Sequence, residues 1–319
     1  MMRTIKLIGI IISLSLSLST ATLALMNRLM YSRSVVFRES MSCINATVNE
    51  HSKYAIIVHG WRESCHVKWV IELARNLRQF RKGCIICMDY GDMAQNPNYL
   101  FLAKQSDDLS EMLADKLREL EDRGYDPSNG YMFGFSLGGR IVLEGGRLYG
   151  KQKIAEIDVC DNAGPGFDIF EQPDSKESAQ NVQCIHTSRD KGTRNRDCHQ
   201  DWNMGFCGRR QMAAGSPPKG SHGLCPIFYN AAFHFDFFAE AIPRQCRRAQ
   251  AYYNFWPSNF KMGYMERRKF EITGEFYSST THEYPYTPDI GSADTILAFE
   301  RFKRRIMRIR KRSKPFRWN

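Results

Sequence analysis

The stretch YMFGFSLGGR, residues 131–140, decides the fold of this chain. Its first five residues indicate a short buried strand, and the residues after Ser136 indicate the start of a helix. Ser136 stands at the turn between them, with Gly134 and Gly138 two positions away on either side. Small residues fit in so tight a turn because larger side chains would clash. This GxSxG junction therefore predicts a nucleophilic serine, and a glycine-rich turn with an exposed serine is the alternative.

Strands alternate with helices on both sides of this turn. The hydrophobic pattern predicts strands at 53–60, 84–90, 131–135, 153–160 and 182–188, and helices at 65–80, around 109–120 and at 137–149. Alternation of this kind is typical of an α/β fold, in which helices cover both faces of a mostly parallel central sheet. Residues 269–280 indicate one further strand, which we expect to be antiparallel.

A reactive serine needs partners that the sequence must supply. The hydroxyl needs a base, usually histidine, that a carboxylate orients, and it needs donors for the oxyanion. The segment IDVCDNAGPGF, residues 157–167, ends the next strand with Asp161, where the chain order Ser-Asp-His requires an acid. Asp158 lies earlier in that strand, so Asp161 is the better orienting acid. The alternative for Asp161 is a turn or cap residue.

Seven segments together resemble the pancreatic lipase family of secreted α/β hydrolases in order and spacing. They are HGW (59–61), GFSLGG (134–139), DNAGP (161–165), IHT (185–187), HQDW (199–202), MGY (262–264) and GEFY (274–277). The resemblance covers roughly residues 50–290 and implies the α/β-hydrolase fold. It also implies that Ser136 is the nucleophile and Asp161 the orienting acid, with the backbone N–H groups of Trp61 and Leu137 as oxyanion donors. The alternative for HGW is a plain strand-end turn.

The catalytic histidine is where the chain departs from this family. The family's histidine follows a cysteine in a C-x-H pattern, whereas Gly220-Ser221-His222 has glycine in the cysteine position. We predict His222 as the base because it lies where a polar loop enters a helix. His234 is expected to pack in an aromatic run, and His199 to have a structural role. The alternative is an inactive lipase-like protein that binds lipid or another ligand, as do the yolk proteins that resemble this family.

The resemblance also bounds the substrate. Related enzymes hydrolyse triacylglycerols, phospholipids at the sn-1 ester, or galactolipids. The loop that precedes His222, roughly residues 207–221, is short and polar and resembles the phospholipase A1 branch. We therefore expect a lipid ester at a membrane or lipoprotein surface as the partner. No metal-ligand spacing stands out, and triad chemistry needs no cofactor.

The N-terminus and the cysteines indicate secretion. Residues 1–24 combine Arg3 and Lys6 with an uncharged apolar run and small residues, which is typical of a signal peptide, and a membrane anchor is the alternative. The ten cysteines predict disulfides in an extracellular protein. Cys84 and Cys87 lie in an apolar strand and are expected to be core or disulfide-bonded residues. Residues 45–47 form a glycosylation acceptor.

The net charge of +11 is concentrated at the C-terminus. Residues 301–319 contain ten Lys or Arg and no acid, so the rest of the chain is nearly neutral and no nucleic-acid partner is expected. The tail suits anionic glycans or phospholipid headgroups, and a solvated end or a processing site is the alternative. The predicted organisation is an irregular lead-in at 25–52, one lipase-like domain at 53–290, and the basic tail at 291–319.

Overall fold

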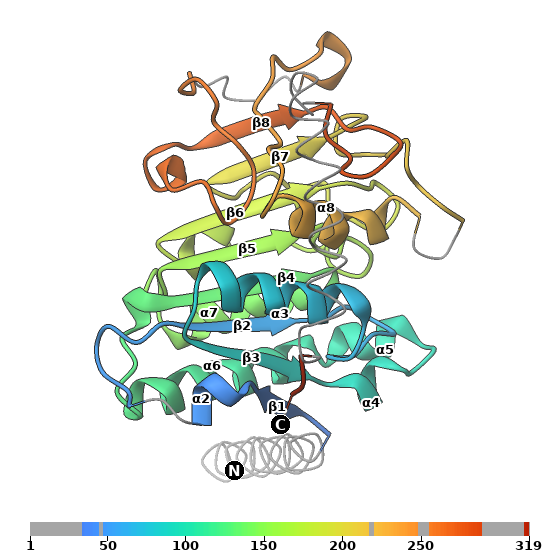
Figure 1. The fold of residues 1–319 in the computed structure, drawn as a ribbon. Coiled ribbons are helices and arrows are strands. Elements are labelled where there is room, and N and C mark those ends of the chain that lie inside the picture. Colours follow the sequence, from blue (N-terminus) through green and yellow to red (C-terminus); the bar gives the residue numbers. More distant parts are fainter. Residues whose placement is uncertain (1–33, 45–46, 217–219, 248–254, 289–315, 319) are drawn as a thin grey trace, which may run out of the picture.

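A computed structural model describes most of the chain between residues 34 and 318 (Figure 1). The described residues are 34–44, 47–216, 220–247, 255–288 and 316–318. The predicted signal peptide, residues 45 and 46 of the glycosylation acceptor, and most of the basic tail lie outside them. Within the described part of the chain, no helix has the length and apolar character needed to cross a bilayer.

Eight strands form one sheet in the order β1-β3-β2-β4-β5-β6-β7-β8. The strands are β1 (Val36–Glu39), β2 (Tyr54–Val58), β3 (Cys84–Asp89), β4 (Gly130–Phe135), β5 (Glu156–Cys160), β6 (Asn181–His186), β7 (Gln200–Met204) and β8 (Gly274–Ser278). Strand β1 pairs antiparallel with β3, and the pairs from β3 through to β8 are parallel. The predicted α/β class, with a mostly parallel sheet, is confirmed.

Two sequence expectations about strands are wrong. The expected antiparallel strand near the C-terminus is β8, which runs parallel to β7. Residues 205–273 connect the two strands, and so long a crossover returns the chain to the same end of the sheet, whereas a tight hairpin would reverse it. The lead-in expected to be irregular contains β1 and the short helix α2 (Met41–Ile44). Strand β1 is a four-residue edge strand without alternating burial, so it carried no periodic signal.

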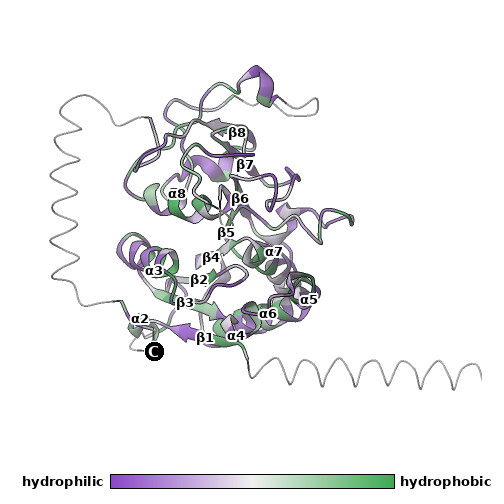
Figure 2. Cartoon of the chain, turned by 90° about the vertical axis from the view of Figure 1, so that its right-hand side faces the viewer, coloured by the Kyte–Doolittle hydropathy of each residue, from purple (hydrophilic) through white to green (hydrophobic). Residues whose placement is uncertain are grey.

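Helices cover both faces of the sheet, as Figure 2 shows with the sheet seen near its edge. They are α3 (Lys68–Phe80), α4 (Gly91–Ala94), α5 (Tyr99–Lys104), α6 (Ser106–Asp122), α7 (Leu137–Tyr149) and α8 (Cys225–Ala231), with 3-10 turns η1 (Pro127–Asn129), η2 (Ser175–Ser178), η3 (His222–Leu224), η4 (Arg244–Cys246) and η5 (Arg268–Glu271). Helices α3 and α8 pack on one face, and α6 and α7 on the other.

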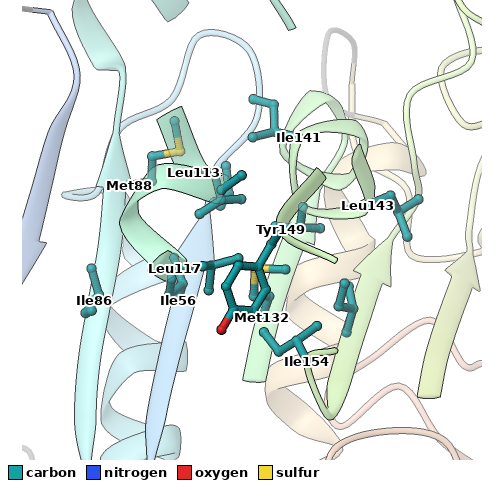
Figure 3. Close-up of a cluster of buried hydrophobic side chains, with 14 of the residues drawn as sticks. Ile56, Ile86, Met88, Leu113, Leu117, Met132, Ile141, Leu143, Tyr149 and Ile154 are labelled. Atoms are coloured by element: carbon teal, nitrogen blue, oxygen red, sulfur yellow. The ribbon is translucent and has the colours of Figure 1, made fainter. Parts of the chain in front are cut away.

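The alternation of side chains along the strands supplies the two cores. In β2, Ile56 and Val58 join the cluster under α6 and α7, while Ala55 and Ile57 join the cluster under α3 and α8. Both sets are fully buried, so the strand reads as a continuous apolar run. Figure 3 shows the first cluster, where Ile56 lies beside Leu117 and other side chains from α6 and α7. These layers hold the carboxyl ends of the parallel strands at one edge.

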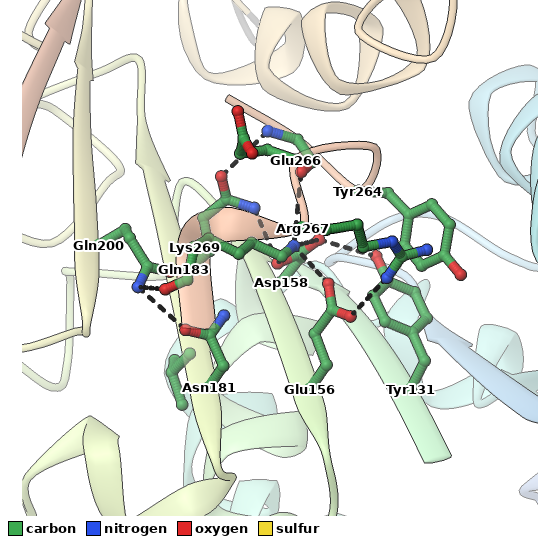
Figure 4. A network of polar contacts seen from close by, with 12 residues as sticks. Tyr131, Glu156, Asp158, Asn181, Gln183, Gln200, Tyr264, Glu266, Arg267 and Lys269 are labelled. Atoms are coloured by element: carbon green, nitrogen blue, oxygen red, sulfur yellow. Dashed lines mark hydrogen bonds and ion pairs between the residues drawn. The ribbon is translucent and has the colours of Figure 1, made fainter. Parts of the chain in front are cut away.

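A buried polar network lies between β5 and η5 (Figure 4). Lys269 of η5 lies against two carboxylates of β5, Glu156 and Asp158, and all three side chains are at most 3% exposed. Asp158 also accepts hydrogen bonds from Gln183 and from the Tyr229 hydroxyl of α8. Burial and the Asp158 carboxylate raise the pKa of Tyr229, so its phenol stays a donor. The network ties η5 and α8 to the centre of the sheet.

All ten cysteines are paired in disulfides, which confirms the predicted use of these residues. The pairs are Cys43–Cys84, Cys65–Cys87, Cys160–Cys225, Cys184–Cys198 and Cys207–Cys246. Cys84 and Cys87 bond to different partners, as expected for structural residues rather than a CxxC metal or redox pair.

The last described residues pack on helix α3 and the turn before it. Phe316 is buried in the core cluster of this face, with the Arg78 guanidinium 5.6 Å from its ring centroid. The Trp318 indole N–H donates to the Cys65 carbonyl at 3.0 Å. This part of the predicted basic tail therefore contributes apolar packing.

Candidate active site

Ser136 lies at the sharp turn between β4 and α7, at the carboxyl edge of the sheet. Its backbone has φ 57° and ψ −121°, a conformation that costs a non-glycine residue of the order of 1–3 kcal/mol. Gly134 and Gly138 are needed because a side chain at either position would clash with backbone atoms. A Cβ on Gly134 would lie 2.4 Å from the Gly138 carbonyl oxygen, and one on Gly138 would lie 2.3 Å from the Val58 carbonyl oxygen. The turn therefore packs against its own helix and against β2.

We expect Gly138→Ala to destabilise the protein by about 2–4 kcal/mol, because backbone atoms of β2 block the added methyl group and cannot rotate away. Thermal unfolding of the purified variant measures the loss. The matched control is Gly215→Ala, where no described atom lies within 4 Å of the added carbon. Equal melting temperatures for the two variants would contradict the close approach between the elbow and β2.

The structure brings Ser136, His222 and Asp161 together from three separate elements. The His222 Nε2 atom lies 2.8 Å from Ser136 Oγ, and His222 Nδ1 lies 2.6 Å from Asp161 Oδ2. Ser136 and His222 are each 8% exposed, whereas Asp161 is fully buried. Each contact is within hydrogen-bond reach, so the imidazole can take the serine proton while the carboxylate holds the other ring nitrogen.

Asp161 is held by donors from the end of β6. Its Oδ1 atom accepts the backbone N–H groups of Thr187 at 2.8 Å and Ser188 at 3.1 Å, and its Oδ2 atom accepts the Ser188 hydroxyl at 2.5 Å. These bonds satisfy a buried carboxylate that would otherwise be costly to desolvate. Asp158, the other acid of this strand, lies in the buried network around Lys269 instead.

His222 begins the turn η3, immediately before α8. Its ring packs against Phe135, with ring centroids 4.8 Å apart. The disulfide Cys160–Cys225 joins the residue before Asp161 to a residue one turn after His222. The disulfide therefore ties the turn that carries His222 to the end of β5, although glycine stands in the cysteine position before this histidine.

The segment His59–Trp61 lies directly beside Ser136. A Cβ on Gly60 would lie 3.1 Å from the Ser136 Cβ, which is a close contact, so the two segments pack tightly. The Gly60 N–H donates to Glu63 at 3.2 Å, and the Trp61 indole donates to the Asn96 carbonyl at 2.7 Å. These bonds hold the turn in place.

Two backbone N–H groups near the serine are available as donors. Neither the Trp61 nor the Leu137 N–H donates to an acceptor among the described residues. Leu137 is the first residue of α7, where the N–H has no partner within the helix. The two amides that the resemblance assigned to the oxyanion therefore flank Ser136 without a competing partner.

Four of the other histidines have structural surroundings. His59 is fully buried, stacks on Tyr90 and contacts the Asp89 carboxylate at 3.4 Å. Burial acts to raise the pKa of Asp89, but hydrogen bonds from His59 and Arg38 outweigh it and hold that pKa well below its usual value. His199 accepts the Val182 N–H at 3.0 Å, which agrees with a structural role.

His234 and a pair that the sequence analysis missed complete this set. His234 follows the end of α8 and packs against Phe80, with ring centroids 5.5 Å apart. His186 contacts Asp201 at 2.8 Å, and both are buried between β6 and β7. Burial raises the pKa of Asp201 well above its usual value. Neither histidine lies in contact with Ser136.

Among the residues that the structure describes, two groups have the atom types of metal ligands. They are His59, Cys65 and Asp89, and Cys184, Cys198 and Asp201. Every cysteine in them belongs to a disulfide, so neither group offers a thiolate to a metal ion.

Comparisons with known proteins identify the family of the chain. A family model described as Lipase matches residues 26–203, more than half of the chain. Lipase member H of Danio rerio is 29% identical over 163 residues, which cover 50% of this chain and 36% of that protein. Lipoprotein lipase of Sus scrofa is 28% identical over 151 residues, which cover 46% of this chain and 31% of that protein.

The chain therefore spans about a third of the length of these curated relatives. Among solved structures, an esterase of Pyrobaculum calidifontis is 13% identical with a TM-score of 0.30, and the match covers 50% of this chain and 71% of that one. So slight a likeness adds nothing to the assignment, which rests on the family match. The chain belongs to the Lipase family, as its resemblance to the pancreatic lipases predicted.

Proposed function

We propose that this protein is a carboxylic ester hydrolase that acts on lipid esters through Ser136. The observation that carries this proposal is the contact chain from Ser136 Oγ to His222 Nε2 at 2.8 Å and from His222 Nδ1 to Asp161 at 2.6 Å. Membership of the Lipase family supports the same chemistry.

The proposed reaction proceeds in two halves. His222 takes the Ser136 proton as the hydroxyl attacks the ester carbonyl, and the Trp61 and Leu137 amides bind the resulting oxyanion. His222 then gives the proton to the departing alcohol, which leaves an acyl group on Ser136. A water molecule, deprotonated by His222, cleaves this acyl-enzyme and restores the serine. Asp161 keeps the imidazole in the required orientation throughout.

A fluorophosphonate probe tests this proposal directly. Such probes react with an activated serine, so the purified protein should be labelled, and it should hydrolyse a soluble short-chain ester. A non-enzymatic lipid carrier on the same scaffold, the alternative function, would show neither. The base within hydrogen-bond reach of Ser136 favours the enzyme over this carrier.

We propose a phospholipase A1-like substrate, because the loop before His222 is short and polar. We also propose that it is met at a lipid surface, because apolar side chains are exposed near the site. Leu100 and Phe101 of α5 are 60% and 40% exposed, and Ile169 and Phe170 of the loop after Asp161 are 78% and 65% exposed. We call these four residues the apolar rim.

Leu100, Ile169 and Phe170 of the rim line a hollow of about 600 Å³ between α5 and residues 166–175. Helix α5 lies next to the His59–Trp61 turn beside Ser136, because Tyr99 packs against Trp61 with ring centroids 5.4 Å apart. Exposed apolar side chains grouped in this way are typical of a surface that meets lipid.

We expect Ile169→Asp combined with Phe170→Asp to lower hydrolysis of emulsified or vesicle lipid at least tenfold, because two apolar anchors no longer enter the lipid surface. Hydrolysis of a soluble short-chain ester should change less than twofold. The two rates, measured on one preparation, separate adsorption from chemistry. Phe255→Asp is the control, since Phe255 is 96% exposed and does not line the hollow. A parallel fall in both substrates would count against the rim.

We also propose that the protein is secreted. The ten cysteines in five disulfides support an oxidising compartment, where such bonds persist. The expected signal peptide at residues 1–24 agrees with it. Release of the protein into the medium of expressing cells, with the N-terminal residue of the mature chain determined, tests both points.

A further inference from the structure

A second hollow, of about 200 Å³, is lined by four arginines. We call it the arginine pocket, and its charged residues are Arg189, Arg194, Arg196 and Arg209. Ser188 and the disulfide Cys207–Cys246 also line the pocket. The chain outside the C-terminal tail is nearly neutral, so four arginines around one small hollow are a local concentration of charge.

The fold gathers these arginines from segments that are separate in the sequence. Three of them follow the end of β6, and Arg209 follows the end of β7. The disulfide Cys207–Cys246 fastens the loop after β7 to η4 and so closes one side of the pocket. All of these loops leave the carboxyl edge of the sheet, which is the edge that carries Ser136.

Arg189, Arg194 and Arg209 are exposed, and no ion pair joins their guanidinium groups to a described acid. Asp168 accepts the backbone N–H of Arg194 at 3.1 Å and is paired with Arg140 through its other oxygen.

Arg196 is held in place by its own hydrogen bonds. Its Nε atom donates to the Asn203 side chain at 2.9 Å, and Nη1 donates to the Asn195 carbonyl at 2.9 Å. One wall of the pocket therefore carries an ordered guanidinium, and the exposed ones surround it. Planar guanidinium groups grouped in this way match the oxygens of a phosphate.

The pocket shares a residue with the catalytic arrangement. Ser188 lines the pocket, and its hydroxyl donates to Asp161 at 2.5 Å. Because His222 protonates the departing alcohol oxygen, the alcohol part of an ester must lie on the His222 side of Ser136. From Ser136, the contacts through His222 and Asp161 lead to Ser188 and the pocket.

The distances suit the alcohol part of a phospholipid. Neighbouring strands lie about 4.8 Å apart, so the end of β6, where three of the arginines follow, is about 10 Å to the side of a serine on β4. Six bonds join the sn-1 carbonyl carbon of a glycerophospholipid to its phosphorus, a reach of about 7 Å, and a guanidinium hydrogen bond to a phosphate oxygen adds about 4 Å.

We propose that the arginine pocket binds the phosphate group of a glycerophospholipid while its sn-1 ester lies at Ser136. This inference rests on the proposed hydrolase function and deepens it, since it assigns the substrate class and the residues that select it. Arg194 and Arg209 supply the contacts that distinguish a phospholipid from a neutral lipid. Arg196 forms the ordered wall of the pocket. A neutral glycerolipid reacts at the same serine without these contacts.

Internal competition tests this proposal. Phosphatidic acid and diacylglycerol, with distinguishable acyl chains, are presented together in the same neutral-detergent micelles, so that surface charge affects both alike. The ratio of their kcat/KM values should fall about tenfold in Arg194→Gln or Arg209→Gln and about 100-fold in the double variant. The control, Arg118→Gln with Arg123→Gln on α6, removes the same charge away from the site and should keep the ratio. Hydrolysis of a soluble neutral ester should stay within twofold in every variant.

Three other outcomes would each contradict one element of this proposal: the phosphate pocket, the hydrolase activity or the lipid ligand. An unchanged ratio in a double variant that still hydrolyses the soluble ester would refute the phosphate pocket and leave the hydrolase intact. A wild-type protein that neither hydrolyses that ester nor reacts with the fluorophosphonate probe would refute the hydrolase itself. If inorganic phosphate or a sulfated glycan binds wild type but not the double variant, while the ratio is unchanged, the pocket holds a free anion or glycan and the lipid assignment is wrong.

Discussion

Replacing Ser136 with alanine is expected to lower kcat/KM for a soluble short-chain ester by about 10⁶-fold, as when a serine triad loses its nucleophile. The reason is geometric, because no other hydroxyl is recorded within hydrogen-bond reach of His222 Nε2 among the described residues. His222→Ala should cost a similar factor, and the double variant should be little worse than either single one. Fluorophosphonate labelling should vanish with Ser136→Ala.

The control for this prediction is Ser128→Ala. Ser128 is exposed in η1, before the amino end of β4, so it lies at the opposite edge of the sheet from the site. Its removal should leave both labelling and turnover unchanged. Retained labelling of Ser136→Ala would show that another residue carries the reaction.

Replacing Lys269 with methionine is expected to lower the free energy of unfolding by about 3–5 kcal/mol, because Glu156 and Asp158 would remain as buried, uncompensated charges. Denaturant unfolding at neutral pH measures the loss. Lys153→Met is the matched control. Its ion pair with Glu121 is more than a third exposed on each side, so its removal should cost less than about 1 kcal/mol.

The effect of Lys269 should also depend on pH. Burial alone would lower the pKa of Lys269, but the carboxylates of Asp158 and Glu156 outweigh burial and raise it. A lysine with a raised folded pKa contributes stability that is complete below its unfolded pKa of about 10.4 and is lost as the pH rises through the folded pKa. The difference between wild type and Lys269→Met should therefore persist at pH 7 and narrow only in strong alkali. Adding Glu156→Gln and Asp158→Asn to the variant should restore part of its stability.

Local patterns were enough to predict the centre of the fold. The apolar run before Ser136 and the helical spacing after it predicted β4 and α7, and the glycines at 134 and 138 predicted the elbow. These signals are local, since strand period, helix period and steric fit are all set within a few residues. The expectation that His222 lies beside a helix start also agrees with its place in η3 before α8.

Features that depend on distant contacts could not be predicted in the same way. The direction of β8 depends on the long crossover from β7, and the pairing of Cys160 with Cys225 depends on two segments that meet only after folding. The arginine pocket is another example. In sequence its residues read as scattered surface charges, and only the adjacent ends of β6 and β7 bring them together.

The disulfide Cys160–Cys225 also bears on how the protein should be produced. It joins the neighbourhoods of the proposed acid and base, so the catalytic alignment is secured covalently during oxidative maturation. Chains made in a reducing cytosol would lack this covalent link between strand and helix. Recombinant material for any of the assays above is therefore best obtained from a secretory host, with quantitation of remaining thiols as the criterion of correct assembly.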